Sequence, residues 1–149
     1  MTRDKKIKSK KVVLASDHAG FKLKEEIKKF LIKKKEKVLD LGTKNNNSVD
    51  YPDYAHLLSK KMKKDEKQFG ILICGSGTGM SMAANKHKNI RAALCYDTKS
   101  TKLSRLHNNA NVMTMGARLI KKNVALKCVN IFLTTDFDGG RHSRRVKKI

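Results

Sequence analysis

Apolar runs of strand length alternate with amphipathic stretches of helix length along almost the whole chain. The first run, "KVVLAS" at Lys11–Ser16, is rich in β-branched residues, and the apolar residues that follow between Phe21 and Leu31 are spaced as one face of a helix. The runs are apolar throughout rather than at every second position, as in strands that are buried on both faces. This pattern predicts parallel strands joined by helices.

Four further runs continue the alternation. They cover residues 37–42 (KVLDLG), 69–74 (FGILIC), 90–96 (IRAALCY) and 111–116 (NVMTMG), and helical stripes separate them. We therefore predict a three-layer α/β/α, Rossmann-like sandwich with a five-stranded parallel sheet, formed as a single domain by residues 11–149. Residues 1–10 are strongly basic, and we expect them to form a disordered arm.

The charge balance raises the question of a nucleic-acid partner. Lys and Arg number 35 against 13 Asp and Glu, which gives a formal net charge of +22, and a basic surface binds polyanions by releasing counterions. The excess is lysine spread over helical faces, and five Phe, three Tyr and no Trp offer few stacking platforms. We therefore interpret the charge as a solvated surface that steers small anions to the protein, with no dedicated nucleic-acid partner.

The cysteines and the lengths of the apolar runs indicate the compartment. Cys74, Cys95 and Cys128 are odd in number and show no CxxC spacing, which is typical of a reducing environment. No run approaches the ~18 residues of a membrane span. We expect a cytoplasmic protein with no membrane partner. No cluster of His and carboxylates has metal-ligand spacing, so we expect neither a metal nor a cofactor.

A glycine-rich loop, "CGSGTG" at residues 74–79, follows the third run. It does not match a dinucleotide fingerprint or a Walker A loop, because Met80 stands where each motif requires Gly. Its glycines let the backbone approach a ligand, and amides at the start of a helix can hold an anion or a developing oxyanion. The same positive helix end favours the thiolate form of Cys74. The alternative is that Cys74 is a small apolar residue that ends a buried strand.

Five blocks, taken together, carry a resemblance to a known family. They are "DH" at Asp17–His18, "CGSGTG", "RLHNNAN", "MGARL" and "GGRHSRRV", in this order. They resemble ribose-5-phosphate isomerase type B and the related galactose-6-phosphate isomerases from about Lys11 to Ile149. The resemblance implies a metal-free aldose–ketose isomerisation of a sugar phosphate, with active sites built at the interface of a homodimer that can form a tetramer.

The resemblance also implies roles for the groups that move protons. Cys74 is the expected base at carbon, which suits a thiolate beside amides that can carry oxyanion charge. His107 resembles the acid/base that opens the sugar ring, and Asp17 resembles its counterpart at the anomeric hydroxyl. Ser76 is expected to bind sugar oxygens and relay the proton between O1 and O2. Some relatives lack the cysteine and carry an acidic residue at the place of Met80, which cannot act as a base.

The phosphate requires fixed positive donors. Arg141 and Arg145 are four residues apart, so on a helical turn they share a face and can bind one phosphate. A guanidinium group can contact a phosphate bidentately, whereas the ammonium group of lysine cannot. His18 and Arg118 resemble the remaining phosphate contacts. The resemblance further implies that the sugar and enediolate are bound by Tyr51, Gly75, Gly77, Gly79 and Asn108.

The remaining predictions place five further residues outside the site and keep two other functions open. We interpret His56 and His87 as solvated surface and place Cys95 and Cys128 in the core, whereas His142 is left outside the expected site. A hexose 6-phosphate isomerase for allose or galactose phosphate stays open, with a pocket set by residues 43–51. A noncatalytic polyanion-binding module stays open as well, and it predicts steeply salt-dependent binding of nucleic acid.

Overall fold

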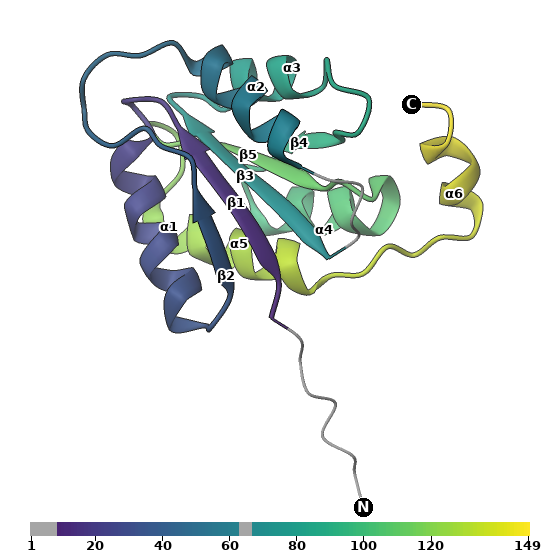
Figure 1. Cartoon of the computed structure of the whole chain (residues 1–149). Coiled ribbons are helices and arrows are strands. Elements are labelled where there is room, and N and C mark those ends of the chain that lie inside the picture. The colour runs from purple at the N-terminus through teal and green to yellow at the C-terminus, as the bar shows by residue number, and fades with distance from the viewer. Residues whose placement is uncertain (1–8, 63–66) are drawn as a thin grey trace, which may run out of the picture.

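Five parallel strands form the centre of the fold (Figure 1). The computed structural model describes residues 9–62 and 67–149, so residues 1–8 of the expected basic arm lie outside the described residues. The strands pair in the order β2-β1-β3-β5-β4, and every neighbouring pair is parallel. Their bounds are β1 Lys11–Ser16, β2 Lys37–Asp40, β3 Gln68–Cys74, β4 Ala92–Leu94 and β5 Val112–Gly116.

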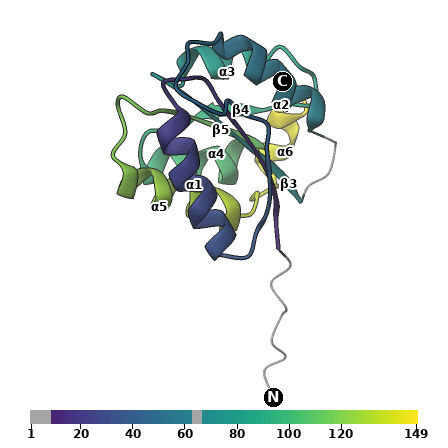
Figure 2. The ribbon, with the colours of Figure 1, turned by 60° about the vertical axis from the view of Figure 1, so that its left-hand side comes forward.

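Helices cover both faces of the sheet (Figures 1 and 2). On one face lie α1 (Phe21–Lys33), α4 (Thr98–Asn108) and α5 (Lys122–Thr134), and on the other lie α2 (Tyr51–Lys61) and α3 (Thr78–Ala84). A short last helix, α6 (Arg141–Val146), lies at the side of the molecule next to α4. The predicted α/β sandwich with a five-stranded parallel sheet is confirmed.

Two apolar cores follow from the alternation of side chains along buried strands. Val12 and Leu14 of β1 face α1 and α5, whereas Val13 and Ala15 face α2 and α3. The larger core is closed by the rings of Phe69 and Phe132, which meet edge to face at 5.6 Å between centroids. Because both faces are buried, these strands are apolar at nearly every position.

Strand ends are where sequence and structure differ. The fourth run was expected to span 90–96, but β4 covers only Ala92–Leu94. The backbone N–H of Arg91 donates to the side-chain oxygen of Asn111 instead of joining the ladder. Among the described residues, no helix is long and apolar enough to cross a membrane.

The strand order creates a crevice between β1 and β3. From β1 the chain moves outward to β2 on one side, and then returns to place β3 on the other side of β1. Loops that leave the carboxyl ends of these two strands therefore diverge, and ligands of open α/β sheets bind at such a point. The segments that follow β1 and β3 contain Asp17–His18 and the 74–79 loop.

Candidate active site

A cavity of about 440 Å³ opens at the carboxyl ends of β1 and β3. Its size lies within the range of small-molecule sites. The loop after β1, the loop after β3, the start of α2 and the segment after β5 all contribute to it. Predicted site residues in its lining are Asp17, His18, Tyr51, Cys74, Gly75, Ser76, Gly79 and Arg118.

Cys74 ends β3 and presents its sulfur to this cavity. The residue is 3% exposed, and its Sγ accepts a hydrogen bond of 3.1 Å from the backbone N–H of Gly77. This hydrogen bond fixes the position of the sulfur beside the loop. The loop amide expected to be free for an oxyanion is therefore directed at the cysteine.

Two glycines of the loop are required by its shape. Gly77 has φ +80°, and a Cβ there would lie 2.7 Å from the backbone carbon of Met115. At Gly79 a Cβ would lie 2.4 Å from the ring of Tyr51, so the absence of a side chain lets this ring close one wall of the cavity. The absence of a Cβ at Gly77 allows close packing of the backbone, and its absence at Gly79 shapes the cavity.

The loop after β1 holds its two polar side chains by local hydrogen bonds. The carboxylate of Asp17, a buried group, accepts a hydrogen bond from the Gly20 N–H at 3.0 Å. Nδ1 of His18 accepts from the Val49 N–H at 3.2 Å, so the neutral ring carries its proton on Nε2. His18 is thereby tied to the long loop before α2, and its other nitrogen remains available as a donor.

Arg118 supplies the positive charge of the cavity. It follows β5, its N–H donates to the carbonyl of Gly75, and a Cβ on Gly75 would come within 3.0 Å of the guanidinium. The side chain is exposed, and among the described residues it has no ion pair within 4.0 Å. Its fork is therefore available to an anion such as a phosphate.

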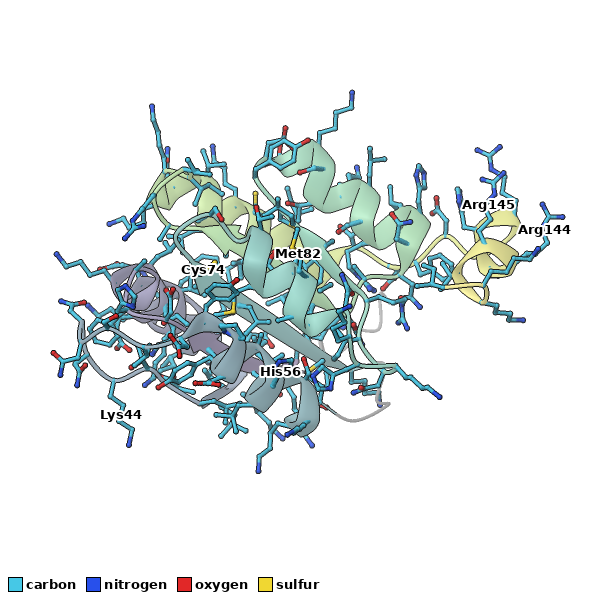
Figure 3. All side chains as sticks on the ribbon, turned by 90° about the horizontal axis from the view of Figure 1, so that it is seen from above. Lys44, His56, Cys74, Met82, Arg144 and Arg145 are labelled. Atoms are coloured by element: carbon cyan, nitrogen blue, oxygen red, sulfur yellow. The ribbon has the colours of Figure 1, made fainter. Side chains whose placement is uncertain are left out.

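The remaining predicted residues lie elsewhere. His107 and Asn108 are the last residues of α4, and Arg141 and Arg145 are on α6. None of them lines the cavity at Cys74, and Figure 3 shows Arg145 at one end of the molecule, far from Cys74. One chain thus presents two separate parts of the predicted site.

Chain topology explains this separation. A helix that connects two parallel strands runs antiparallel to them, so α4 ends at the amino edge of the sheet, just before Val112 begins β5. The predicted parallel sheet already requires this edge for the end of "RLHNNAN", whereas the resemblance assigns His107 to the same site as Cys74. His107 is therefore carried to the edge opposite Cys74.

The sequence missed one partner of His107. The ring of His142 stacks on that of His107, with centroids 4.3 Å apart and planes tilted by 15°. Burial lowers the pKa of His142 below its ordinary value, and His107, Arg141 and Arg145 add to this effect. His142 is therefore neutral near pH 7 and packs beside His107 without adding a charge.

These two rings and Asp138 form the one group among the described residues with metal-ligating side chains close together. Their ligand atoms all lie within 4.8 Å of one another. Lone pairs of imidazole lie in the ring plane, so two stacked rings direct them side by side rather than at one ion. The arrangement therefore suits a metal centre poorly.

A second histidine pair corrects an expectation. His56 and His87, interpreted from the sequence as solvated surface, are half-buried and share a hydrogen bond of 2.8 Å between Nδ1 and Nε2. The pair links α2 to the turn after α3. The residues are 31 apart in sequence, and only the packing of the two helices brings them together. Cys95 and Cys128 lie in the core, as predicted.

Comparison with known proteins agrees with this geometry. The family model for ribose/galactose isomerases matches residues 12–149. Ribose-5-phosphate isomerase B of Escherichia coli is 41% identical over 140 residues, which cover 94% of this chain and 94% of that protein. The crystal structure of the ribose 5-phosphate isomerase RpiB of Thermotoga maritima superposes with a TM-score of 0.90 at 50% identity, covering 93% of this chain and 96% of that one.

A third relative was solved with a sugar phosphate. The ribose-5-phosphate isomerase B of Mycoplasma genitalium, with bound ribulose-5-phosphate, superposes with a TM-score of 0.89 at 44% identity and covers 93% of this chain and 92% of that one. The matches extend over nearly the whole described chain, including both parts of the predicted site. The chain therefore belongs to the ribose/galactose isomerase family and is a sugar phosphate isomerase of the ribose-5-phosphate isomerase B group.

Proposed function

We propose that this protein interconverts ribose 5-phosphate and ribulose 5-phosphate, with Cys74 as the base at carbon. The observation that carries the proposal is the position of Cys74 Sγ, hydrogen-bonded by the Gly77 amide in the lining of a cavity that also contains Arg118. The sequence similarity to a relative solved with ribulose-5-phosphate supports the same substrate.

The reaction needs an open sugar chain before carbon chemistry starts. Asp17 would accept the proton of the anomeric hydroxyl while His107 of the partner subunit protonates the ring oxygen, which releases the C1 aldehyde. The Cys74 thiolate then takes the proton from C2, and the electron pair forms the C1–C2 double bond of an enediolate with its charge on O1. Asn108 of the partner subunit would hold this enediolate.

The second half of the reaction reverses the proton transfer at the neighbouring carbon. The hydroxyl of Ser76 would relay the O2 proton to O1, and the Cys74 thiol returns its proton to C1, which leaves the C2 ketone of ribulose 5-phosphate. No atom is gained or lost, and the thiolate is regenerated. Asp17 then releases its proton to water and His107 takes one up from water before the next turnover. One base serves both carbons because C1 and C2 are adjacent.

The phosphate would be held from two sides. Arg118 and His18 line the same cavity as Cys74, and Arg141 and Arg145 of the partner subunit would complete the grip. Bidentate guanidinium contacts fix a phosphate more firmly than ammonium groups do. A phosphate anchored in this way places the sugar carbons at the sulfur.

A homodimer would bring the two parts together. Large apolar side chains are exposed on α3, on β4, on α4 and on the segment between β4 and α4: Met82 is 67% exposed, Tyr96 62%, Leu103 38% and Leu94 37%. β4 is also an edge strand of the sheet. Exposed edges and apolar patches are typical of interfaces. We propose that a second copy covers this surface and contributes its His107 and arginines to the cavity.

The test is isomerase activity on ribose 5-phosphate, beside allose 6-phosphate and galactose 6-phosphate, for wild-type protein and the Cys74→Ala variant. We expect pentose turnover that falls by about 10²–10⁴-fold without the thiol, together with loss of C2 proton exchange into D₂O. Cys128→Ala is the matched control, because that cysteine is buried in the core away from the cavity. It should keep wild-type activity.

Other outcomes would redirect the proposal. Turnover of hexose phosphates alone would keep the mechanism and change the substrate. Pentose turnover that survives in Cys74→Ala would exclude the thiol as the base. Absence of any turnover, with salt-dependent binding of nucleic acid, would favour the noncatalytic polyanion-binding module instead.

A further inference from the structure

A second cavity lies at the opposite edge of the sheet from Cys74. It has a volume of about 350 Å³, and it is formed where β3 and β5 begin and where α4 ends. Among residues 9–62 and 67–149, none lines both this cavity and the one at Cys74. Its polar lining includes two arginines, Arg91 and Arg105, with Asn109, Asn111 and Asp136.

Arg105 is held rigidly in this cavity. The residue is only 7% exposed, and its guanidinium lies 5.1 Å from the ring centroid of Phe69. Nε donates to the carbonyl of Thr135 at 3.0 Å, and Nη1 donates to Ala110 O and Asn109 Oδ1. Its Nη2 group makes no hydrogen bond to another described residue. A fixed guanidinium with one open side is pre-organised for an anion, because little side-chain entropy is lost on binding.

Arg91 brings a second positive charge to the same cavity. Its Nε donates to the carbonyl of Asn109 at 2.8 Å, so Asn109 contacts both arginines. Both terminal nitrogens of Arg91 lack a hydrogen-bond partner among the described residues. Neither arginine forms an ion pair within 4.0 Å with a carboxylate of the described chain.

The two charges are unfavourable without a counterion. Burial lowers the pKa of both guanidinium groups from the ordinary value, and Arg91 lowers that of Arg105 further by repulsion. Asp136, an exposed carboxylate in the lining, acts in the opposite direction on Arg105 but does not reach ion-pair distance. An anion between the guanidinium groups would relieve both the repulsion and the missing solvation.

We propose that this cavity is a second anion site, separate from the substrate cavity, which binds a phosphate group of a small molecule between Arg91 and Arg105. Both guanidinium groups line one cavity, and the three terminal oxygens of a phosphate can accept hydrogen bonds from two guanidinium groups at once. A single carboxylate has fewer acceptor positions and should bind more weakly. The proposal does not depend on the isomerase reaction.

The test is an NMR titration of ¹⁵N-labelled full-length protein with inorganic phosphate, and separately with acetate, at constant ionic strength. The side-chain amides of Asn109 and Asn111 report on the cavity, because both line it. We expect saturable shifts with phosphate and an apparent Kd at least about tenfold weaker for acetate. The shifts should persist in Arg118→Gln, which separates this site from phosphate binding beside Cys74.

Matched variants distinguish a site from general attraction by the net charge. Arg91→Gln should weaken phosphate binding about tenfold or more, and Arg91→Lys should weaken it less because the charge is kept while the fork is lost. Arg144→Gln removes the same charge from an exposed position on α6 (Figure 3) and should leave the Kd unchanged. Shifts that stay linear in wild-type protein, or equal losses in Arg91→Gln and Arg144→Gln, would overturn the proposal.

Discussion

At the scale of single residues, the environment of Cys74 depends on two nearby glycines that have no side chain. Gly77 adopts a left-handed φ that directs its N–H at the sulfur, and Gly79 leaves room for the ring of Tyr51. The three cysteines are all buried, yet among them only Cys74 lines the candidate active site. We therefore expect the rate at which each thiol is alkylated to depend on its hydrogen bond and on its access to the cavity, and not on the exposed area of its sulfur.

Alkylation should distinguish the cysteines. Burial raises the pKa of Cys95 to about 11 and also raises that of Cys128, so both remain neutral thiols near pH 8. Iodoacetamide at that pH should label Cys74 at least about tenfold faster, because only the thiolate reacts. Peptide mass spectrometry gives the three rates, and ribose 5-phosphate should protect Cys74. Equal rates at all three positions would show that the cavity does not activate Cys74.

Two glycine substitutions should separate stability from binding. In Gly77→Ala the new methyl meets the backbone near Met115 and a positive φ is strained, so unfolding free energy should fall by about 1–3 kcal/mol. In Gly79→Ala the methyl meets the far end of the Tyr51 ring, which can move. Gly79→Ala should keep its Tm and raise the KM for sugar phosphate. Thermal unfolding and steady-state kinetics check both, and the reverse pattern would contradict the assigned roles.

At the scale of elements, a buried ion cluster fixes α1 to the end of β2. Nζ of Lys24, 1% exposed, lies 2.7 Å from the carboxylates of Asp40 and Glu25, and Lys28 adds a contact of 3.1 Å to Asp40. Asp40 also accepts a hydrogen bond from the Gly42 N–H, at the start of the loop that leads to α2. The cluster thus positions the loop whose Val49 amide contacts His18.

Asp40→Asn should cost about 3 kcal/mol of unfolding free energy, because it leaves Lys24 buried with only a half-exposed partner. Burial disfavours the charged form of Asp40, but hydrogen bonds from Lys24, Gly42 and Lys28 outweigh it and hold its pKa below the ordinary 3.8. This stability is present above that pH and is lost as the pH falls through the folded-state pKa. Denaturant unfolding at pH 7 and pH 2 measures both effects.

The control for this prediction is Glu25→Gln. Glu25 contacts the same Nζ but its side chain is 37% exposed, so its loss should cost at most about 1 kcal/mol. Equal destabilisation by the two variants would show that the buried contact to Asp40 is not the dominant one. A pH dependence that persists unchanged in Asp40→Asn would assign the acid sensitivity to another group.

The sequence predicted elements better than it predicted contacts. Continuous apolar runs located all five strands, and β1 matched residue for residue. The direction of α4 follows from the predicted parallel sheet, but the spacing of residues did not show that His107 lies outside the lining of the cavity at Cys74. The sequence also did not predict the contact of His56 with His87 or that of His142 with His107, because these contacts form only when separate elements pack together.

At the scale of the whole molecule, one chain carries both parts of the proposed active site without joining them. The cavity at Cys74 contains Arg118 and His18, and α4 and α6 hold His107, Arg141 and Arg145 away from it. The proposed active site therefore requires two copies of the chain, in which α4 and α6 of each copy complete the cavity of the other. Symmetric pairing would give two equal sites in a dimer.

Mixed dimers test this claim most directly. Cys74→Ala and His107→Asn chains, each inactive alone, are co-expressed with different affinity tags, and the heterodimer is purified through both. One of its cavities combines both defects and the other is intact, so activity should return to about half that of wild-type dimer. Cys74→Ala paired with Arg118→Gln is the control, because both changes fall in cavities of their own subunits and should leave no intact site. For a shared site we expect about half of the wild-type activity in the Cys74→Ala/His107→Asn heterodimer and none in the control. An inactive Cys74→Ala/His107→Asn heterodimer would contradict a site shared between two copies.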